Sequence, residues 1–290
     1  MGSRQPSQTS QAAGAGWWAA IGAGGIKPCV SAHVGDQFGQ QNAHLVARAF
    51  AFFYLSINVG AAIAQNLTPW LLEHHGPHAA FGLPGVLMVI ATFVFWLGRH
   101  RFAHIPPGGK EFVKEALGAE GMRVFGRLAL LFTFVAMFWT LFDQTASSWV
   151  AQGRRMELHG HNWLADSMQS ANPIFILLLT PLFSFLIYPF VERRVSLTPM
   201  RKIGVGMVLA ALSFLYSAGV EAVISSGVKP TILWQLGAYG LLTAGELLVS
   251  VTALEYAYTQ APLRMKSMVM SLYLASAALG NLFTVGVTRL

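Results

Sequence analysis

Residues 79–98 read AAFGLPGVLMVIATFVFWLG, twenty residues without Asp, Glu, Lys or Arg. A helix needs about 20 mostly apolar residues to cross a bilayer. In the whole chain of 290 residues, 54% are hydrophobic and 11% are charged, and the mean hydropathy is +0.52. A soluble globular domain carries about 25% charged residues. The composition therefore excludes a soluble enzyme and a disordered chain, and it predicts an all-α, multi-pass membrane protein.

Similar apolar stretches lie on both sides of this one. Most contain no Asp, Glu, Lys or Arg; the exceptions hold Lys27, Asp143, or both Glu246 and Glu255. The sequence predicts about eight transmembrane helices, the shortest of which contains Lys27. The predicted spans are 16–32, 49–72, 79–98, 128–153, 171–191, 203–220, 231–259 and 267–288.

The spans form two groups on either side of a polar linker. We expect a disordered N-terminal tail at 1–15 and three helices of an N-terminal bundle at 16–98. A cytoplasmic linker at 99–127 then precedes five helices of a C-terminal bundle at 128–290.

The basic residues are shared unequally between alternate loops. Lys and Arg total 13 in the loops on one side and 3 in the loops on the other. Loops rich in Lys and Arg lie on the cytoplasmic side of a membrane. We therefore expect a protein of the plasma or inner membrane with its basic loops in the cytoplasm. This distribution explains the net charge of +7, so the charge does not indicate a nucleic-acid partner.

Ionisable residues inside the predicted spans carry the functional signal. Such groups are costly in hydrocarbon, so they line a cavity or pair with one another. Lys27 attracts a carboxylate, and Glu246 attracts an ammonium group, which suits a zwitterionic ligand. A carboxylate partly removed from water binds a proton more readily, so it can exploit a proton gradient. The alternative is that these groups form structural pairs or reach to the membrane surface.

Two other features bear on cofactors. The single cysteine, Cys29, excludes a disulfide framework. The pairs His74/His78 and His100/His104 have i,i+4 spacing, which leaves a membrane-embedded metalloenzyme as an alternative of another class. However, these residues lie at span ends or in loops, and Gly76-Pro77 interrupts the first cluster. We expect neither a metal nor another cofactor.

Five motifs occur in order along the chain and together resemble the proton-dependent oligopeptide transporter (POT) family of the major facilitator superfamily. They are GGIKPCVSA (24–32) with GDQF (35–38), FFYLSINVG (52–60), FWTLFDQ (138–144) with SSW (147–149), NP (172–173), and the run from GE (245–246) to MKS (265–267). The resemblance places them on the fourth, fifth, seventh, eighth and tenth helices of the family.

The resemblance implies proton-coupled symport of di- and tripeptides by alternating access, with small peptides, protons and the lipid bilayer as partners. By resemblance, Lys27 binds the peptide carboxylate or takes part in coupling. Asn58, Asn172 and Glu246 bind the amino end, and Ser250 lines the same site. Asp143 belongs to a gating or proton-relay pair, whereas Glu255 receives no role. Tyr54, Trp139 and Tyr273 are candidate walls of side-chain pockets.

Several alternatives remain open. Asn58 and Asn172 are also the kind of residue that bonds one membrane helix to another, and aromatic residues at helical spacing commonly serve packing alone. By resemblance, the chain begins before the fourth family helix and ends in or after the eleventh, which predicts a truncated member. Such a chain is either a carrier of peptides, a carrier of another small solute such as nitrate, or a non-transporting remnant. The oligomeric state does not follow from the sequence.

Overall fold

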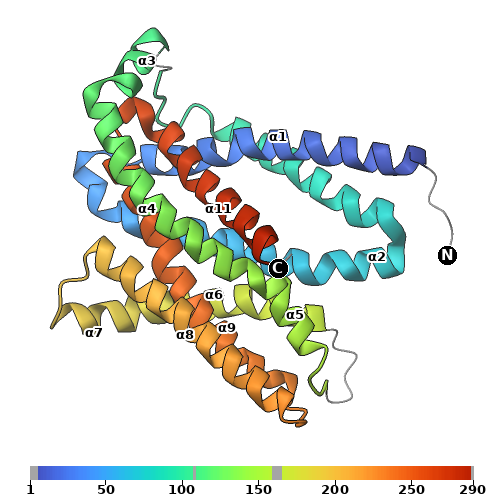
Figure 1. Ribbon diagram of the computed structural model, residues 1–290. Helices are drawn as coiled ribbons and strands as arrows, with labels where there is room; N and C mark the ends of the chain where they lie inside the picture. Colours follow the sequence, from blue (N-terminus) through green and yellow to red (C-terminus); the bar gives the residue numbers. More distant parts are fainter. Residues whose placement is uncertain (1–5, 107–108, 159–164, 289–290) are drawn as a thin grey trace.

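The computed structural model describes residues 6–106, 109–158 and 165–288, and these residues are almost entirely helical (Figure 1). One isolated β-bridge joins Glu157 to Thr231. Two π-helical turns, Phe183–Ile187 and Leu247–Val251, join α6 to α7 and α9 to α10. The α-helices are α1 (Pro6–Asp36), α2 (Val46–Gly98), α3 (Gly109–Leu117), α4 (Ala119–Asp143), α5 (Ser148–Gly153), α6 (Ala171–Leu182), α7 (Tyr188–Glu192), α8 (Pro199–Ser225), α9 (Gln235–Glu246), α10 (Thr252–Gln260) and α11 (Lys266–Thr288).

Six helical stretches in the described part of the chain are long and apolar enough to cross a membrane. They are 41–98, 119–153, 168–192, 199–225, 232–260 and 266–286. Together, the six stretches contain or overlap all the spans that hydropathy predicts except 16–32. The first has 58 residues, which at 1.5 Å per residue is about three times the thickness of the hydrocarbon core. It therefore has room for both predicted spans, 49–72 and 79–98.

Gly76 divides these two spans. Its φ of 80° and ψ of 178° are not helical and suit a residue without a Cβ atom. Pro77 follows and cannot donate a backbone hydrogen bond. Figure 1 shows the second half of α2 folding back from this point. The predicted helix break at Gly76-Pro77 is thus confirmed.

The N-terminal region differs from the expected disordered tail at 1–15. Helix α1 begins at Pro6 and runs 31 residues to Asp36, while residues 1–5 lie outside the described residues. Residues 7–13 are rich in Gln and Ala, which have good helix propensity, so the helix extends beyond the apolar run. The predicted span at 16–32 lies within α1, which is not among the six stretches.

The main helix pairs bring distant segments together. Helix α4 packs along α11, and α8 packs along α9. Helix α6 contacts both α2 and α9, whereas α1 contacts α11. The second half of α2 leaves large apolar side chains exposed, including Phe81, Val89 and Phe93. Such a continuous apolar surface is suited to lipid and not to water.

Candidate functional site

Glu246 is a buried acid that receives hydrogen bonds from two other helices. It is 3% exposed at the end of α9. The Tyr54 hydroxyl of α2 donates to Oε1, and the Asn172 amide of α6 donates to Oε2 over 2.5 Å. The same amide donates to the Thr243 hydroxyl over 3.1 Å. The structure therefore brings together Tyr54, Asn172 and Glu246, three of the residues predicted for one site.

The π-helical turn after Glu246 places Ser250 close to this group. A π-helix has more residues per turn than an α-helix, and such turns occur frequently at functional sites. Ser250 is fully buried, and its hydroxyl has no hydrogen-bond partner among the described residues. Its carbonyl accepts from the Tyr273 hydroxyl over 3.3 Å. Ser250 and Tyr273 also lie close to Tyr54, so both extend the cluster around Glu246.

Asn58 and Trp139 have local surroundings of their own. Asn58 is buried, and its amide donates over 2.9 Å to the carbonyl of Tyr54, one turn earlier in α2. Trp139 packs against Phe138 and Phe142, with ring centroids 5.7 and 5.2 Å apart. Its indole nitrogen is buried without a partner among the described residues.

Lys27 does not join the Glu246 cluster. Its side chain is exposed on α1, and within the described residues it forms no ion pair with Glu246 or another acid. Within the described residues, the structure therefore shows no contact between Lys27 and Glu246. A cavity shared by these two residues stays a prediction.

Asp143 lies at the end of α4 and faces α11. In the amide orientation that satisfies both neighbours, the Asn281 nitrogen donates to the Asp143 carboxylate and to the carbonyl of Ala277. Nearby, Thr140 donates to the carbonyl of Gly280 over 3.2 Å. Asp143 is therefore part of the α4–α11 contact.

A second polar group joins α1 to the α10–α11 turn. The Tyr258 hydroxyl donates to Asp36 over 2.8 Å, and Lys266 lies 3.4 Å from the same carboxylate oxygen. Lys266 also donates to the Tyr258 hydroxyl over 2.5 Å. Gly35 allows this approach, because a methyl group there would lie 2.3 Å from the Tyr258 ring. We name Asp36, Tyr258 and Lys266 the α1–α10 contact group.

Sequence reasoning assigned no role to Thr243, Asn281 or the α1–α10 contact group. Asp36, Tyr258 and Lys266 lie within the quoted motifs but at span ends, where polar side chains are common. Thr243 lies three residues before Glu246 and thus on the same helix face, and this spacing could have indicated that it belongs to the site.

Glu255, to which the sequence also assigned no role, lies within the electrostatic reach of Lys202. The Lys202 ammonium in turn lies 4.6 Å from the Tyr188 ring.

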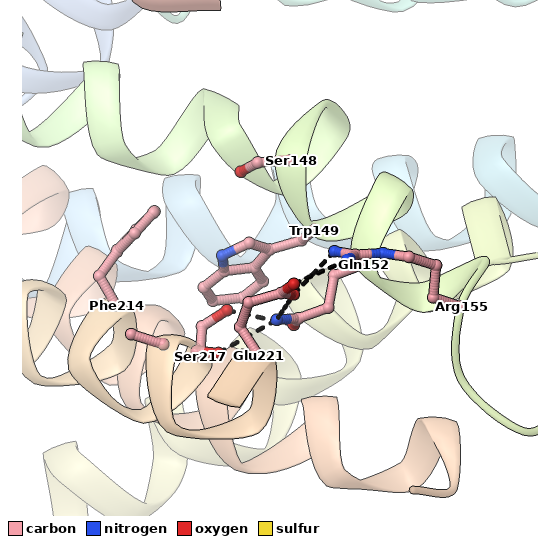
Figure 2. Close-up of a pocket in the computed structure, with 8 residues that line it drawn as sticks. Ser148, Trp149, Gln152, Arg155, Phe214, Ser217 and Glu221 are labelled. Carbon is pink, nitrogen blue, oxygen red and sulfur yellow. Dashed lines mark hydrogen bonds and ion pairs between the residues drawn. The ribbon is translucent and has the colours of Figure 1, made fainter. Parts of the chain in front are cut away.

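A cavity of about 340 Å³ lies elsewhere, between α5 and α8 (Figure 2). Trp149 and Phe214 form its apolar part. Arg155 and Gln152 both bond to Glu221, as Figure 2 shows, over 2.7 and 3.1 Å. None of the predicted site residues lines this cavity.

The histidine clusters do not form a metal site in the described part of the chain, where no group of three or more His, Cys, Asp or Glu could bind a metal ion. His74 and His75 instead contact the ring of Trp70. His159 and His161, which also cluster in the sequence, lie outside the described residues.

Comparison with known proteins agrees with the helical fold and the motifs. The family model described as "POT family" matches residues 18–119 and 118–290. The chain belongs to the POT family. The predicted family and the all-α membrane fold are thereby confirmed.

Individual POT family members are similar over most of the chain. It is 34% identical to "Peptide transporter family 1" of Drosophila melanogaster over 244 residues, 70% of this chain and 33% of the relative. It is also 34% identical to human "Solute carrier family 15 member 2", over 71% of this chain and 34% of the relative. The crystal structure of the POT family transporter PepTSo is 35% identical, with a TM-score of 0.72 over 93% of this chain and 68% of that chain. The chain thus spans about a third of the length of these curated relatives.

Proposed function

We propose that this chain acts in the proton-coupled symport of di- and tripeptides by alternating access. The observation that carries the proposal is the buried Glu246 carboxylate, bonded at once to α2 and α6. An acid within a membrane span is costly unless it has a function or a partner. The relatives' names, which describe peptide transporters, support the same function. We propose a carrier and not an enzyme, without a cofactor.

The hydrogen bonds at Glu246 suggest how a proton acts. In the described geometry both carboxylate oxygens accept a hydrogen bond. A protonated carboxyl group has an O–H that must donate. The Tyr54 hydroxyl can turn and accept it, whereas the Asn172 amide nitrogen can only donate. Protonation therefore changes the bond between α9 and α2 before it changes the bond between α9 and α6.

The same groups fit a peptide amino end. An ammonium group can replace Tyr54 or Asn172 as a donor to Glu246, and the unpartnered Ser250 hydroxyl lies beside it. We propose Asn58, Tyr54 and Trp139 as further parts of this site, and Lys27 as the partner of the peptide carboxylate. Asp143, in contact with Asn281, is proposed for gating or proton transfer.

Alternating access requires contacts between the two helical bundles that close the transporter on one side of the membrane and break when that side opens. The α1–α10 contact group is a suitable candidate, because it joins the N-terminal helices at 16–98 to the C-terminal helices at 128–290. We propose these ranges as the two bundles, with 99–127 as a cytoplasmic linker. In support, Arg264 of the α10–α11 turn pairs with Glu111 of α3 within the linker.

Uptake of a labelled dipeptide into proteoliposomes under an inward proton gradient tests the proposal. The purified chain should accumulate the dipeptide, and Glu246→Gln should abolish accumulation or its dependence on pH. Glu73→Gln is a matched control, because Glu73 is exposed on α2. Exchange of dipeptide without response to the gradient would contradict proton coupling. Absence of both binding and exchange would favour a non-transporting member.

A further inference from the structure

Two glycines lie at a close approach of α8 and α9, and one of them directly precedes Glu246. A methyl group on Gly245 would lie 2.7 Å from the carbonyl oxygen of Gly206. A methyl group on Gly206 would lie 2.8 Å from the carbonyl oxygen of Gly245 and 2.7 Å from Cγ2 of Val249. Small residues allow membrane helices to pack backbone against backbone. We name this contact the Gly206–Gly245 crossing.

The nearest obstacles to a side chain at Gly245 are backbone atoms, which cannot turn away, whereas Gly206 faces the backbone carbonyl of Gly245 and the side chain of Val249. A side chain at Gly245 would also lie 3.3 Å from the backbone nitrogen of Ala210. Any substitution must separate α8 from α9, although these helices pack along much of their length. The distance between the two backbones is thus fixed by the absence of two Cβ atoms.

This distance determines where Glu246 lies. Glu246 follows Gly245 in α9, and its carboxylate must meet Tyr54 on α2 and Asn172 on α6. Hydrogen bonds weaken steeply outside a narrow range of distance and angle. Helix α8 supports α9 on one side, and the two donors reach it from other helices. A shift of α9 by a fraction of an ångström therefore changes both bonds.

We infer that Gly206 and Gly245 are positioning residues for the Glu246 carboxylate, a role that rests on the proposed function for its effect on transport. They contact neither peptide nor proton. They set the geometry in which Glu246 meets Tyr54 and Asn172, and hence the proton and peptide affinities of the site.

The test compares alanine at the crossing with alanine nearby. Gly245→Ala and Gly206→Ala introduce the clash. Gly204→Ala on α8 is the matched control, because no atom lies within 4 Å of a methyl group there, and Gly240→Ala on α9 meets only Phe175 at 3.9 Å. The measured quantities are the pH midpoint of Glu246 protonation, from the carboxyl infrared band that Glu246→Gln removes, and the KM of dipeptide uptake.

Both crossing variants should shift the infrared midpoint and raise KM several-fold, while both controls stay at the parental values. A folded Gly245→Ala protein with unchanged midpoint and KM would overturn the inference. Should Gly245→Ala fail to fold, Gly206→Ala combined with Val249→Ala relieves one of the clashes, with Val249→Ala alone as its reference. Misfolding of every crossing variant would also overturn it, because the crossing would then serve stability alone.

The infrared measurement separates this inference from the proposed function. If the parental chain shows no uptake, the transport proposal fails, but the protonation midpoint still reports whether the crossing positions Glu246. If uptake occurs and the midpoint is unchanged in the crossing variants, the positioning role fails alone.

Discussion

At the scale of single residues, the Tyr54 hydroxyl is the group through which the protonation state of Glu246 affects α2. Tyr54→Phe removes this donor and keeps the ring. A hydrogen bond to a charged group contributes about 1.5–3 kcal/mol, which corresponds to roughly tenfold or more in an equilibrium constant. We expect a loss of uptake of at least this size and an altered pH dependence. Tyr216→Phe, at an exposed tyrosine of α8, should leave both unchanged.

Thr243 supports Asn172 through its hydroxyl oxygen, which accepts from the same amide that bonds to Glu246. Thr243→Val removes the acceptor at nearly constant volume, and Thr243→Ser retains it. One neutral hydrogen bond contributes about 1 kcal/mol, or about fivefold. The KM for a dipeptide should therefore rise by this factor in the valine variant and return toward the parental value in the serine variant. Equal KM values in the two variants would show that the Thr243 hydroxyl does not contribute to the site.

At the scale of helices, the α1–α10 contact group should couple two segments more strongly than the surface pair Arg264–Glu111. The side chains of Asp36 and Lys266 are 14% and 15% exposed, whereas those of Glu111 and Arg264 are 72% and 44% exposed. Exposed pairs contribute about 0.2–1 kcal/mol because water and salt screen them. Residues in one hydrogen-bonded network show couplings of about 0.5–3 kcal/mol.

A double-mutant cycle of Asp36→Asn and Lys266→Met measures this coupling from the unfolding of the protein in mixed micelles with increasing SDS. The same cycle with Glu111→Gln and Arg264→Met is the reference. The first coupling energy should exceed the second. Equal coupling energies would show that the α1–α10 contact group does not join the two halves of the chain.

The helices themselves were largely predictable from the sequence, and their partners were not. Long apolar stretches such as 79–98 require a helix wherever lipid is the solvent, since every backbone group must be bonded internally. Hydropathy does not say that α4 packs along α11 or that a π-turn follows Glu246, because these depend on side chains from other helices. Glu246 and Asn172 stood out as polar residues among apolar ones. Tyr258 and Asp36 did not, because they lie at the ends of their helices.

At the scale of the whole molecule, the unequal distribution of Lys and Arg predicts which ends of the helices face the cytoplasm. Val195 lies in the basic loop between α7 and α8, and Val228 lies in the loop at the opposite end of α8. Both side chains are exposed, at 47% and 55%. Each can be replaced by cysteine in a Cys29→Ser background, which removes the single native thiol.

A membrane-impermeant maleimide applied to intact cells should label Val228→Cys and not Val195→Cys, and permeabilised cells should show labelling of both. The reason is that α8 crosses the bilayer once, so its two ends lie in different compartments, and the basic end is retained in the cytoplasm. Labelling of Val195→Cys alone in intact cells would invert the topology. Labelling of both would place the two ends of α8 on one side and contradict a membrane-spanning α8, on which the assignment of Glu246 to the membrane interior also depends.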